Sequence, residues 1–458
     1  MRYIVPRQRR LTTRYFDHPA TRELQMMSAI LDEHPELLDL VMADLTKNLA
    51  VNKGRRGMSA EQVLRVLVIK TMYQEPYEEL SFRLQDSTSY TAFCRLGLGF
   101  KRSASALQEN LRRLRPETLE AINKVLVGGE FAAGRDKADK VRVDCTVTET
   151  NIHEPTDSSL LWDCVRVLTR LLEQAAFALP GTFIFTDHRR RAKRRFQAIQ
   201  HAKKEVARKR LYRDLVNVTE WVLGYVEKAM LAVEAGTFVG LLGDLEKGAL
   251  LSELSAFASL ARRVVSQTRR RVFDGEQVPA IEKVVSIFEP HTDVIKKERR
   301  DTEFGHKICL SVGRRSLVYD CAVLEGNPAD SSMAAEMIER HIQQFGKPPR
   351  QVAFDGGFAS KKNLREIKAL GVGDVAFNKK RGIAVEDMTK SSWVYHHLSR
   401  FRAGVEGVIS YLKRCFGLRC CNWKGFESFK SYVWSSIIAA NLLTMARYRL
   451  AMARPRPA

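Results

Sequence analysis

A change of hydrophobic period at residues 140–148 constrains the fold of this chain more than any other feature. Val141, Val143, Cys145 and Val147 alternate there with polar residues, which is the two-residue period of a β-strand. The segments before and after it have apolar residues at the three- and four-residue spacing of helices. The chain is therefore predicted to be a mixed α/β protein in which long helical stretches flank and interrupt a sheet.

Strand patterns return in residues 284–450. We expect strands at 284–288, 304–312, 316–325, 349–354 and 375–377, the second and third joined as a hairpin by Gly313-Arg314-Arg315, and helices at 330–345, 361–370, 399–415 and 426–450. A meander followed by alternating helices and strands is typical of a mixed α/β sheet.

Residues 1–130 are predicted to be helical. Helical spacing runs through 24–31, 35–48 and 59–73, the last opened by Ser59 with Gln62 three residues on, which is a capping-box pattern. Two short helices at 77–84 and 87–96 and a longer one at 105–127, interrupted near Pro116, follow. This succession fits a helix-turn-helix module that binds DNA through Arg112, Arg113 and Arg115. It fits equally well a plain helical bundle with solvated arginines.

Residues 181–283 are predicted to form a basic helical insertion. Half of the residues from Arg189 to Arg210 are Lys or Arg, and helical periodicity continues after them. The outer face of such helices can lie along a phosphate backbone; a solvated basic helix without a ligand is the alternative. The residues that we expect to contact DNA here are Arg189, Arg190, Arg191, Lys193, Arg194 and Arg195.

The charge balance of the chain indicates a polyanionic partner. Lys and Arg number 75 against 53 Asp and Glu, a formal net charge of +22. Nucleic acid is the leading candidate and an anionic membrane surface the second. The N-terminus lacks the apolar segment of a signal peptide, and the longest apolar run, 432–446, is shorter than the roughly 20 residues of a membrane span. We therefore expect a soluble cytoplasmic protein with no membrane partner.

Three acidic residues stand where a metal site is favoured. Asp144 lies in mid-strand, where Asp is disfavoured, and Asp355 ends a strand before two glycines, where open α/β sheets keep their sites. Glu406 lies on a helix that carries Arg402 and Lys413 on nearly the same face. Clustered carboxylates need cations to neutralise them, and two Mg²⁺ ions would support phosphodiester displacement. The ordinary alternatives are an Asp-Gly turn at Asp355 and a surface ion pair of Arg402 with Glu406.

Three sequence blocks resemble those of DDE transposases of bacterial insertion sequences, and the similarity extends from about Ser59 to Leu450. The third block differs from the family's Tyr-Arg-Glu-Lys signature because Ser399 stands at the tyrosine position; Tyr395, one turn earlier, is a candidate substitute. The blocks are Val143-Asp144-Cys145-Thr146 with Pro155-Thr156-Asp157, then Phe354-Asp355-Gly356-Gly357-Phe358, then Arg402, Glu406 and Lys413 in the signature spacing, with Phe304-Gly305-His306-Lys307 resembling a strand before the second aspartate.

The resemblance implies a ribonuclease H-like mixed sheet with helices on both faces and an N-terminal all-helical domain. The helical insertion after the first strand is predicted from the residues themselves, and its role does not follow from the resemblance. It implies that Asp144, Asp355 and Glu406 are catalytic and hold two Mg²⁺ ions, for which Mn²⁺ would substitute. Arg402 and Lys413 would contact DNA. The reaction implied is hydrolytic cleavage at the element ends, followed by attack of the freed 3′-hydroxyl on target DNA. The partners would be double-stranded DNA, as terminal inverted repeats and target, and a second copy of the chain in a synapse at the bacterial nucleoid.

The predicted organisation is a helical DNA-binding domain (1–130), two parts of a catalytic domain (138–180 and 284–450) separated by the basic insertion (181–283), and a tail (451–458). Two other functions fit the sequence. One is a catalytically silent or domesticated derivative that only binds DNA, and the other is a structure-specific nuclease on the same fold. The basic insertion and the helical N-terminal module favour the transposase, because a junction nuclease needs neither.

Overall fold

The computed structural model describes residues 17–47, 57–97, 99–236, 243–296 and 301–453, so the predicted tail lies outside the described residues from 454 on. The chain divides into two compact units. We call residues 1–151 with 306–458 the sheet unit and residues 152–305 the insertion unit. The insertion unit takes in residues 152–180, which the predicted organisation places in the first part of the catalytic domain (138–180).

The sheet has β1 (Lys140–Thr150) at its centre. Among the described residues the strand order is β2-β3-β1-β5-β6, with β4 also paired to β3 and β7 to β1. β3 and β4 form an antiparallel hairpin, as predicted, whereas β1, β5 and β6 are parallel. This mixed α/β arrangement is consistent with the predicted ribonuclease H-like fold. The other strands are β2 (Asp293–Ile295), β3 (Glu303–Gly313), β4 (Val318–Val323), β5 (Gln351–Phe354), β6 (Asp374–Phe377) and β7 (Cys420–Cys421).

The prediction of a strand at 284–288 is wrong. This segment has no regular structure, and the short strand β2 lies later in the chain. Val284 donates its backbone N–H to Oε1 of Gln267 at 2.8 Å, and the side chains of Val284 and Ile287 are buried in the core of the insertion unit. The apolar residues of the segment therefore reflect packing against helices instead of strand pairing.

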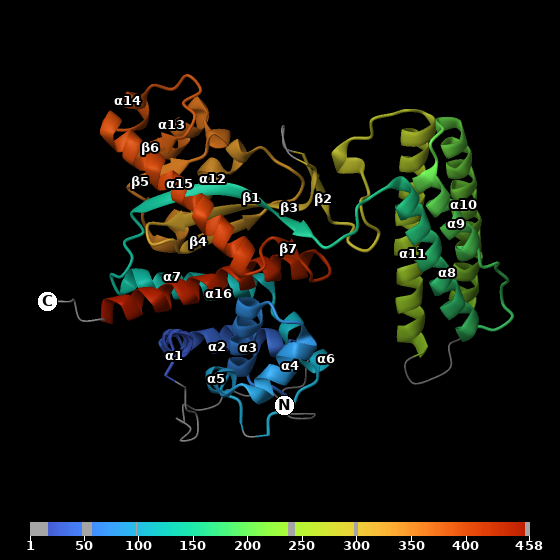
Figure 1. Cartoon of the computed structure of the whole chain (residues 1–458), viewed down its shortest axis with the longest axis horizontal. Coiled ribbons are helices and arrows are strands. Elements are labelled where there is room, and N and C mark those ends of the chain that lie inside the picture. Colours follow the sequence, from blue (N-terminus) through green and yellow to red (C-terminus); the bar gives the residue numbers. More distant parts are fainter. Residues whose placement is uncertain (1–16, 48–56, 98, 237–242, 297–300, 454–458) are drawn as a thin grey trace. The chain divides into compact units, whose positions relative to one another are not determined.

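Most helices of the sheet unit share one hydrophobic core with the sheet. α7 and α16 lie side by side beneath it (Figure 1) and pack against β4, and α16 also packs against α1 and α3. Pro116 begins α7, as the predicted interruption requires. The helices are α1 (Pro19–Asp32), α2 (Glu36–Thr46), α3 (Ala60–Tyr73), α4 (Tyr77–Asp86), α5 (Thr88–Phe93), α6 (Ala104–Arg112), α7 (Pro116–Ala132), α12 (Ala334–Phe345), α13 (Lys361–Ala369), α14 (Val385–Met388), α15 (Ser392–Cys415) and α16 (Phe426–Ala453).

The predicted capping box at the start of α3 is confirmed. The Oγ atom of Ser59 accepts a hydrogen bond from the backbone N–H of Gln62 at 3.2 Å. The backbone N–H of Ser59 donates in return to Oε1 of Gln62 at 3.1 Å. Two N–H groups that the helix leaves unpaired are thereby satisfied.

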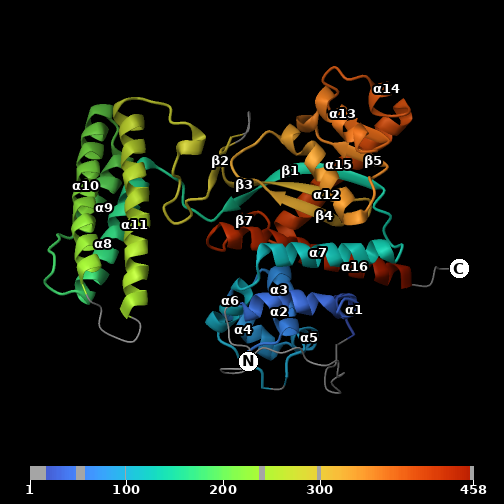
Figure 2. The same ribbon diagram turned by 180° about the vertical axis from the view of Figure 1, so that it is seen from behind.

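The insertion unit is a bundle of long helices with its own core (Figure 2). α8, α10 and α11 pack against one another, and α9 lies against α8 and α10. The core between them is built from aliphatic side chains such as Leu168, Val222 and Ala261. The helices are α8 (Asp157–Ala178), α9 (Arg189–His201), α10 (Glu205–Ala235) and α11 (Gly243–Thr268), the last continued by a π-helical turn at Arg269–Phe273.

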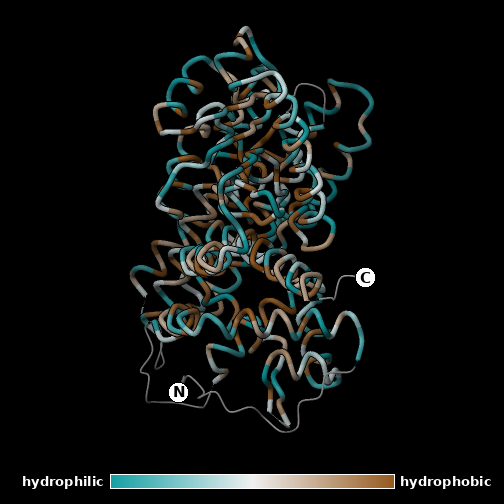
Figure 3. Tube along the Cα trace, turned by 90° about the vertical axis from the view of Figure 1, so that its left-hand side faces the viewer, coloured by the Kyte–Doolittle hydropathy of each residue, from teal (hydrophilic) through white to brown (hydrophobic). Residues whose placement is uncertain are grey.

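The hydropathy of the chain follows this packing. Figure 3 shows hydrophobic segments inside and hydrophilic segments in the outer loops. The apolar run 432–446 lies in α16, where Val433, Ile437 and Leu442 are buried in the core of the sheet unit. Within the described ranges, no helix has both the length and the apolar character that crossing a membrane requires.

Candidate active site

The pairing of β1 with β5 brings Asp144 and Asp355 together. The two strands are parallel, and Val143 lies opposite Phe354, so the next residue along each strand is an aspartate. Asp144 lies within β1, and Asp355 follows the last residue of β5. Asp355 therefore lies at the carboxyl end of its strand, as the sequence predicts.

Close packing of α15 on β1 brings Glu406 and Arg402 to the same place. A Cβ atom at Gly404 would lie 2.2 Å from Nη1 of Arg142, a residue of β1. That Nη1 atom donates a hydrogen bond to the backbone carbonyl of Phe401 at 3.0 Å. The absence of a side chain at Gly404 thus lets Arg142 of β1 pack closely against the turn of α15 that carries Arg402 and Glu406.

The guanidinium of Arg402 joins all three predicted acids. Its Nη2 atom lies 3.0 Å from Oδ2 of Asp144 and 3.0 Å from Oδ1 of Asp355, so these two oxygens are at most twice that distance apart. Its Nη1 atom donates to Oε1 of Glu406 at 2.9 Å. The i,i+4 pair of Arg402 with Glu406 exists as the ordinary alternative requires, but it is one part of a cluster that also includes both aspartates.

The four side chains of the cluster differ in their exposure to solvent. The side chains of Asp144 and Arg402 are each 12% exposed, whereas those of Asp355 and Glu406 are 37% and 67% exposed. Burial raises the pKa of Asp144 to about 6; the Arg402 charge lowers it and the Asp355 charge raises it further. The backbone N–H of Cys145 also donates to Oδ1 of Asp144 at 2.8 Å. A buried carboxylate that needs a positive partner is thus at the centre of the site.

A fourth acid, which sequence reasoning missed, lies beside the cluster. Asp330 accepts a hydrogen bond from Nζ of Lys307 at 3.0 Å, and its charge contributes to the raised pKa of Asp144. A Cβ atom at Gly357 would lie 2.8 Å from Oδ2 of Asp330, so this glycine lets the Asp330 side chain approach closely. Asp330 follows a loop after β4, and no local pattern marks it.

The donor chemistry of the cluster fits a divalent cation. Carboxylate oxygens are the ligands that Mg²⁺ prefers, and those of Asp144, Asp355 and Glu406 already surround a positive group. Within the part of the chain that the structure describes, no three Asp, Glu, His or Cys side chains are arranged so that they could hold an ion directly. The guanidinium of Arg402 lies between the three carboxylates instead.

The remaining signature positions differ in their surroundings. Ser399 donates its hydroxyl to the backbone carbonyl of Tyr395 at 3.0 Å, within the same helix. Tyr395 is 6% exposed and donates its own hydroxyl to the carbonyl of Phe377 at 2.9 Å, so its ring is not available to replace the signature tyrosine at a DNA surface. Lys413 lies near the end of α15 and lines a cavity there.

The arginines predicted for the N-terminal module have different partners. Arg115 donates to the fully buried carboxylate of Asp44 through its backbone N–H at 2.8 Å and its Nε at 2.5 Å. Arg113 pairs with Glu109 at 2.8 Å. Arg112 is exposed on α6. Of the three, Arg112 is therefore the one best placed for an external phosphate.

The basic helix α9 has two kinds of basic residue. Arg189 pairs with Glu173 and Asp187, and Arg191 and Arg195 both pair with Asp214 at 2.5 Å. These ion pairs tie α9 to its neighbours within the insertion unit. The exposed arginine and lysine residues of the helix are Arg190, Lys193 and Arg194.

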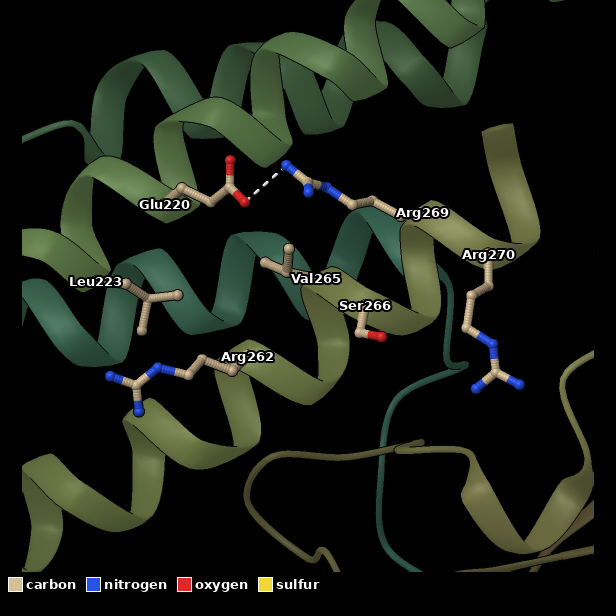
Figure 4. A pocket seen from close by; sticks show the side chains of 7 residues that line it. All are labelled: Glu220, Leu223, Arg262, Val265, Ser266, Arg269 and Arg270. Atoms are coloured by element: carbon tan, nitrogen blue, oxygen red, sulfur yellow. Dashed lines mark hydrogen bonds and ion pairs between the residues drawn. The ribbon is translucent and has the colours of Figure 1, made fainter. Parts of the chain in front are cut away.

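A small pocket of about 260 Å³ lies between α10 and α11 of the insertion unit (Figure 4). Its arginines are already neutralised: Arg269 pairs with Glu220 at 2.7 Å and Arg262 with Glu227 at 2.8 Å. Arg270 pairs with two further glutamates. The pocket therefore offers little net charge to a phosphate group.

Two segments of the chain match known protein families. Residues 268–442 match the family described as transposase DDE domain, and residues 18–113 match the family described as transposase domain (DUF772). Asp355, Arg402, Glu406 and Lys413 fall within the first match, whereas Asp144 falls within neither. Comparisons with curated proteins and with solved structures found no match. The two family matches are consistent with an insertion-sequence DDE transposase and confirm the resemblance that the sequence blocks indicate.

Proposed function

Because two separate segments of the chain match transposase domains, we propose that it is the DNA transposase of an insertion sequence. In this proposal it binds the terminal inverted repeats of its element, cleaves the DNA at the element ends and joins the freed 3′-hydroxyls to target DNA. A second copy of the chain completes the synapse. The net charge of +22 supports a polyanionic substrate.

The observation that carries the proposal is the convergence of Asp144, Asp355 and Glu406 on one guanidinium. Three carboxylates from two strands and a helix, brought around one positive group, are costly unless the site uses the charge. An ordinary surface ion pair would need neither aspartate.

In the proposed reaction the three carboxylates hold two Mg²⁺ ions, or Mn²⁺ in their place. When bound, such ions activate the attacking oxygen and stabilise the leaving oxygen of an in-line displacement. Asp144 and Asp355 supply ligands fixed by paired strands, and Glu406 supplies a more exposed ligand from α15. The bulk of β1 and α15 around Asp144 limits the access of water to that carboxylate.

Arg402 has two roles in this proposal. Without metal it neutralises the carboxylates, as the structure has it. Once cations take over that neutralisation, its N–H donors become available to a phosphate of the bound strand, for which a guanidinium is well shaped. Lys413 and the exposed basic residues Arg112, Arg190, Lys193 and Arg194 extend the phosphate contacts.

The direct test uses the purified protein and duplex DNA that carries the ends flanking its own reading frame, with Mg²⁺ or Mn²⁺. Asp144→Asn, Asp355→Asn and Glu406→Gln should each lower end cleavage and strand transfer by at least about a thousandfold, since metal ligands supply several kcal/mol to such a reaction. Binding to the same DNA should change little. Glu386→Gln, at an exposed carboxylate of α14, is the matched control.

The outcomes separate the alternatives. Wild-type protein that binds the ends but never cuts them, with either metal, is a silent DNA-binding derivative. Cleavage of branched DNA whatever its terminal sequence indicates a structure-specific nuclease. Cleavage that survives Asp144→Asn contradicts the proposed site.

A further inference from the structure

A basic cavity lies at the C-terminal end of α15, within the sheet unit. Its volume is about 440 Å³, inside the range of roughly 300–1,000 Å³ that is typical of ligand pockets. The end of α3 forms one wall, and the segment that runs from the end of α15 to α16 forms the other. The lining side chains that matter here are Lys70, Lys413, Arg414, Arg419, Asn422 and Trp423.

The charge of this cavity is positive. None of the described residues that line it is Asp or Glu. Arg414 and Arg419 are exposed at its rim, whereas Lys70 is buried; its Nζ donates to the backbone carbonyl of Glu75 at 3.1 Å and lies over the Tyr77 ring. A concave surface with cations at different depths suits an anion that enters it, instead of a backbone that passes over it.

The cavity also offers an aromatic side chain with an unused donor. The indole Nε1 of Trp423 is buried and has no hydrogen-bond acceptor among the described residues. The Trp423 ring meets the Tyr432 ring edge-on, with centroids 5.6 Å apart. Cations together with an aromatic ring are the combination by which proteins hold single-stranded nucleic acid.

The walls of the cavity are fixed in place. Tyr432 donates its hydroxyl to the carbonyl of Gly417 at 2.8 Å, and Nε2 of Gln74 donates to the carbonyl of Arg414 at 3.3 Å. The second bond links the end of α3 to the end of α15. The cavity is therefore preformed, which reduces the entropy that a ligand would lose on binding.

The position of the cavity relates it to the carboxylate cluster. Lys413 is seven residues after Glu406 on nearly the same face of α15, so it lies about 10 Å farther along the helix. That length corresponds to about three nucleotides at the rise of a DNA duplex. A strand held at the carboxylates therefore reaches the cavity within a few nucleotides.

We propose that this cavity binds an unpaired nucleotide of the DNA strand that continues from the carboxylate cluster. Its phosphate lies against Arg414 and Arg419, and its base lies against Trp423. A nucleotide inside a duplex does not fit, because both faces of its base are covered by its neighbours. The proposal rests on the proposed function, since it takes DNA as the substrate, and adds that the DNA is unpaired close to the cleavage site.

The test measures DNA binding without divalent metal, so that no reaction occurs. One probe is a fluorescent blunt duplex, and the other is the same duplex with a short single-stranded extension. The wild-type protein should bind the extended probe about tenfold more tightly, as expected for stacking one base. The double variant Arg414→Glu with Arg419→Glu should lose that preference. Arg350→Glu with Arg365→Glu, at exposed positions of the sheet unit, carries the same charge change and should keep it.

A second readout reports on the base itself. With 2-aminopurine as an unpaired base of the extension, stacking on Trp423 should quench its fluorescence, and Trp423→Phe should weaken the quenching while the melting temperature stays close to that of the wild type. Equal affinity of the wild type for both probes overturns the proposal. So does a preference that survives Arg414→Glu with Arg419→Glu.

The result of this binding test does not depend on whether the protein cleaves DNA, so the cavity proposal and the proposed function can fail separately. Asp144→Asn protein should keep the preference for the extended probe, because that residue takes no part in the cavity. A clear preference in a protein that never cuts DNA would support the cavity and contradict the transposase. Cleavage of the element ends by a wild-type protein that shows no preference for the extended probe would support the transposase and contradict the cavity proposal.

Discussion

At the scale of single residues, Arg402 is the side chain on which the candidate site depends. It is mostly buried, and it is the positive group that allows Asp144, Asp355 and Glu406 to lie close together. A guanidinium with several N–H donors can satisfy three carboxylates at once. The contacts of Arg402 with these carboxylates therefore stabilise the proposed metal site in the protein before any metal is bound.

Arg402→Ala should destabilise the metal-free protein and increase its response to metal. Removing one partner leaves a buried carboxylate uncompensated, and we expect a loss of about 1–3 kcal/mol, less than for a fully buried pair because Glu406 is largely exposed. Mg²⁺ or Mn²⁺ should then raise the melting temperature of the variant more than that of the wild type, since it restores the missing charge.

Differential scanning calorimetry in a chelator and then in excess metal makes this measurement. Arg400→Ala removes an exposed arginine from the same helix and is the control. If both variants melt alike in the chelator, Arg402 is not the counter-ion of the site.

How far the sequence predicts the site depends on the residue. Asp144 and Asp355 are marked locally, one by a charge in mid-strand and the other by the glycines after a strand. The pair of Arg402 with Glu406 follows from helical spacing. The contacts of Arg402 with the two aspartates depend on how α15 crosses the sheet, which local patterns do not contain. No local sequence pattern predicts Asp330 either, because its place beside the cluster also depends on how the chain folds.

At the scale of elements, α15 approaches β1 closely at Gly404, where a Cβ atom would lie 2.2 Å from Nη1 of Arg142. Gly404→Ala should push α15 away from Arg142, whose guanidinium is held by Phe401, and should cost about 1–2 kcal/mol in the free energy of unfolding together with most of the cleavage activity. Chemical denaturation and an end-cleavage assay measure the two effects.

The matched control for this change lies one turn away. A Cβ atom at Gly407 would meet nothing within 4 Å, so Gly407→Ala should stabilise the protein by about 0.5–1 kcal/mol through helix propensity. Equal effects of the two substitutions would show that the contact of Gly404 with Arg142 does not position α15.

The helix α9 provides a second test at this scale, because its paired and exposed basic residues differ. Changing Arg190, Lys193 and Arg194 together to Gln should weaken DNA binding and reduce the dependence of log K on log salt by about 2–3, since each phosphate that a cation neutralises adds nearly one to this slope. Changing Arg191 and Arg195 to Gln should chiefly affect stability, because both pair with Asp214. A salt titration of DNA affinity distinguishes them. Equal slopes for the two variants would show that α9 does not bind DNA through its exposed residues.

Periodicity predicts the elements of this chain well where the burial of one face is the dominant constraint. The helices of the N-terminal region and the strands β1, β3, β4, β5 and β6 all follow from it. It fails at 284–288, since burial against a helical bundle gives an irregular segment the same apolar pattern as a strand. Spacing alone also does not tell the paired arginines of α9 from the exposed ones, since the difference comes from Glu173, Asp187 and Asp214 on neighbouring segments.

At the scale of the whole molecule, the described part of the chain has two separate hydrophobic cores. One contains the sheet with the N-terminal and C-terminal helices, and the other contains only residues from 160 to 287. The N-terminal helices, which the sequence predicts as a domain of their own, share the core of the sheet through α7 and α16. The long helix α16 connects the two ends of the chain within that core, a relation that no local pattern predicts.

Two cores joined by two stretches of chain should unfold in two steps. Leu254 in α11 and Ile437 in α16 are each fully buried, one in each core, and truncation of such residues to Ala costs about 2–5 kcal/mol. Leu254→Ala should lower one calorimetric transition by several degrees and leave the other in place, and Ile437→Ala should do the opposite. A single transition that both variants lower alike would mean that the insertion unit and the sheet unit fold as one cooperative body. With two transitions, the basic insertion unit would be able to loosen while the carboxylates, held by β1, β5 and α15, keep their arrangement.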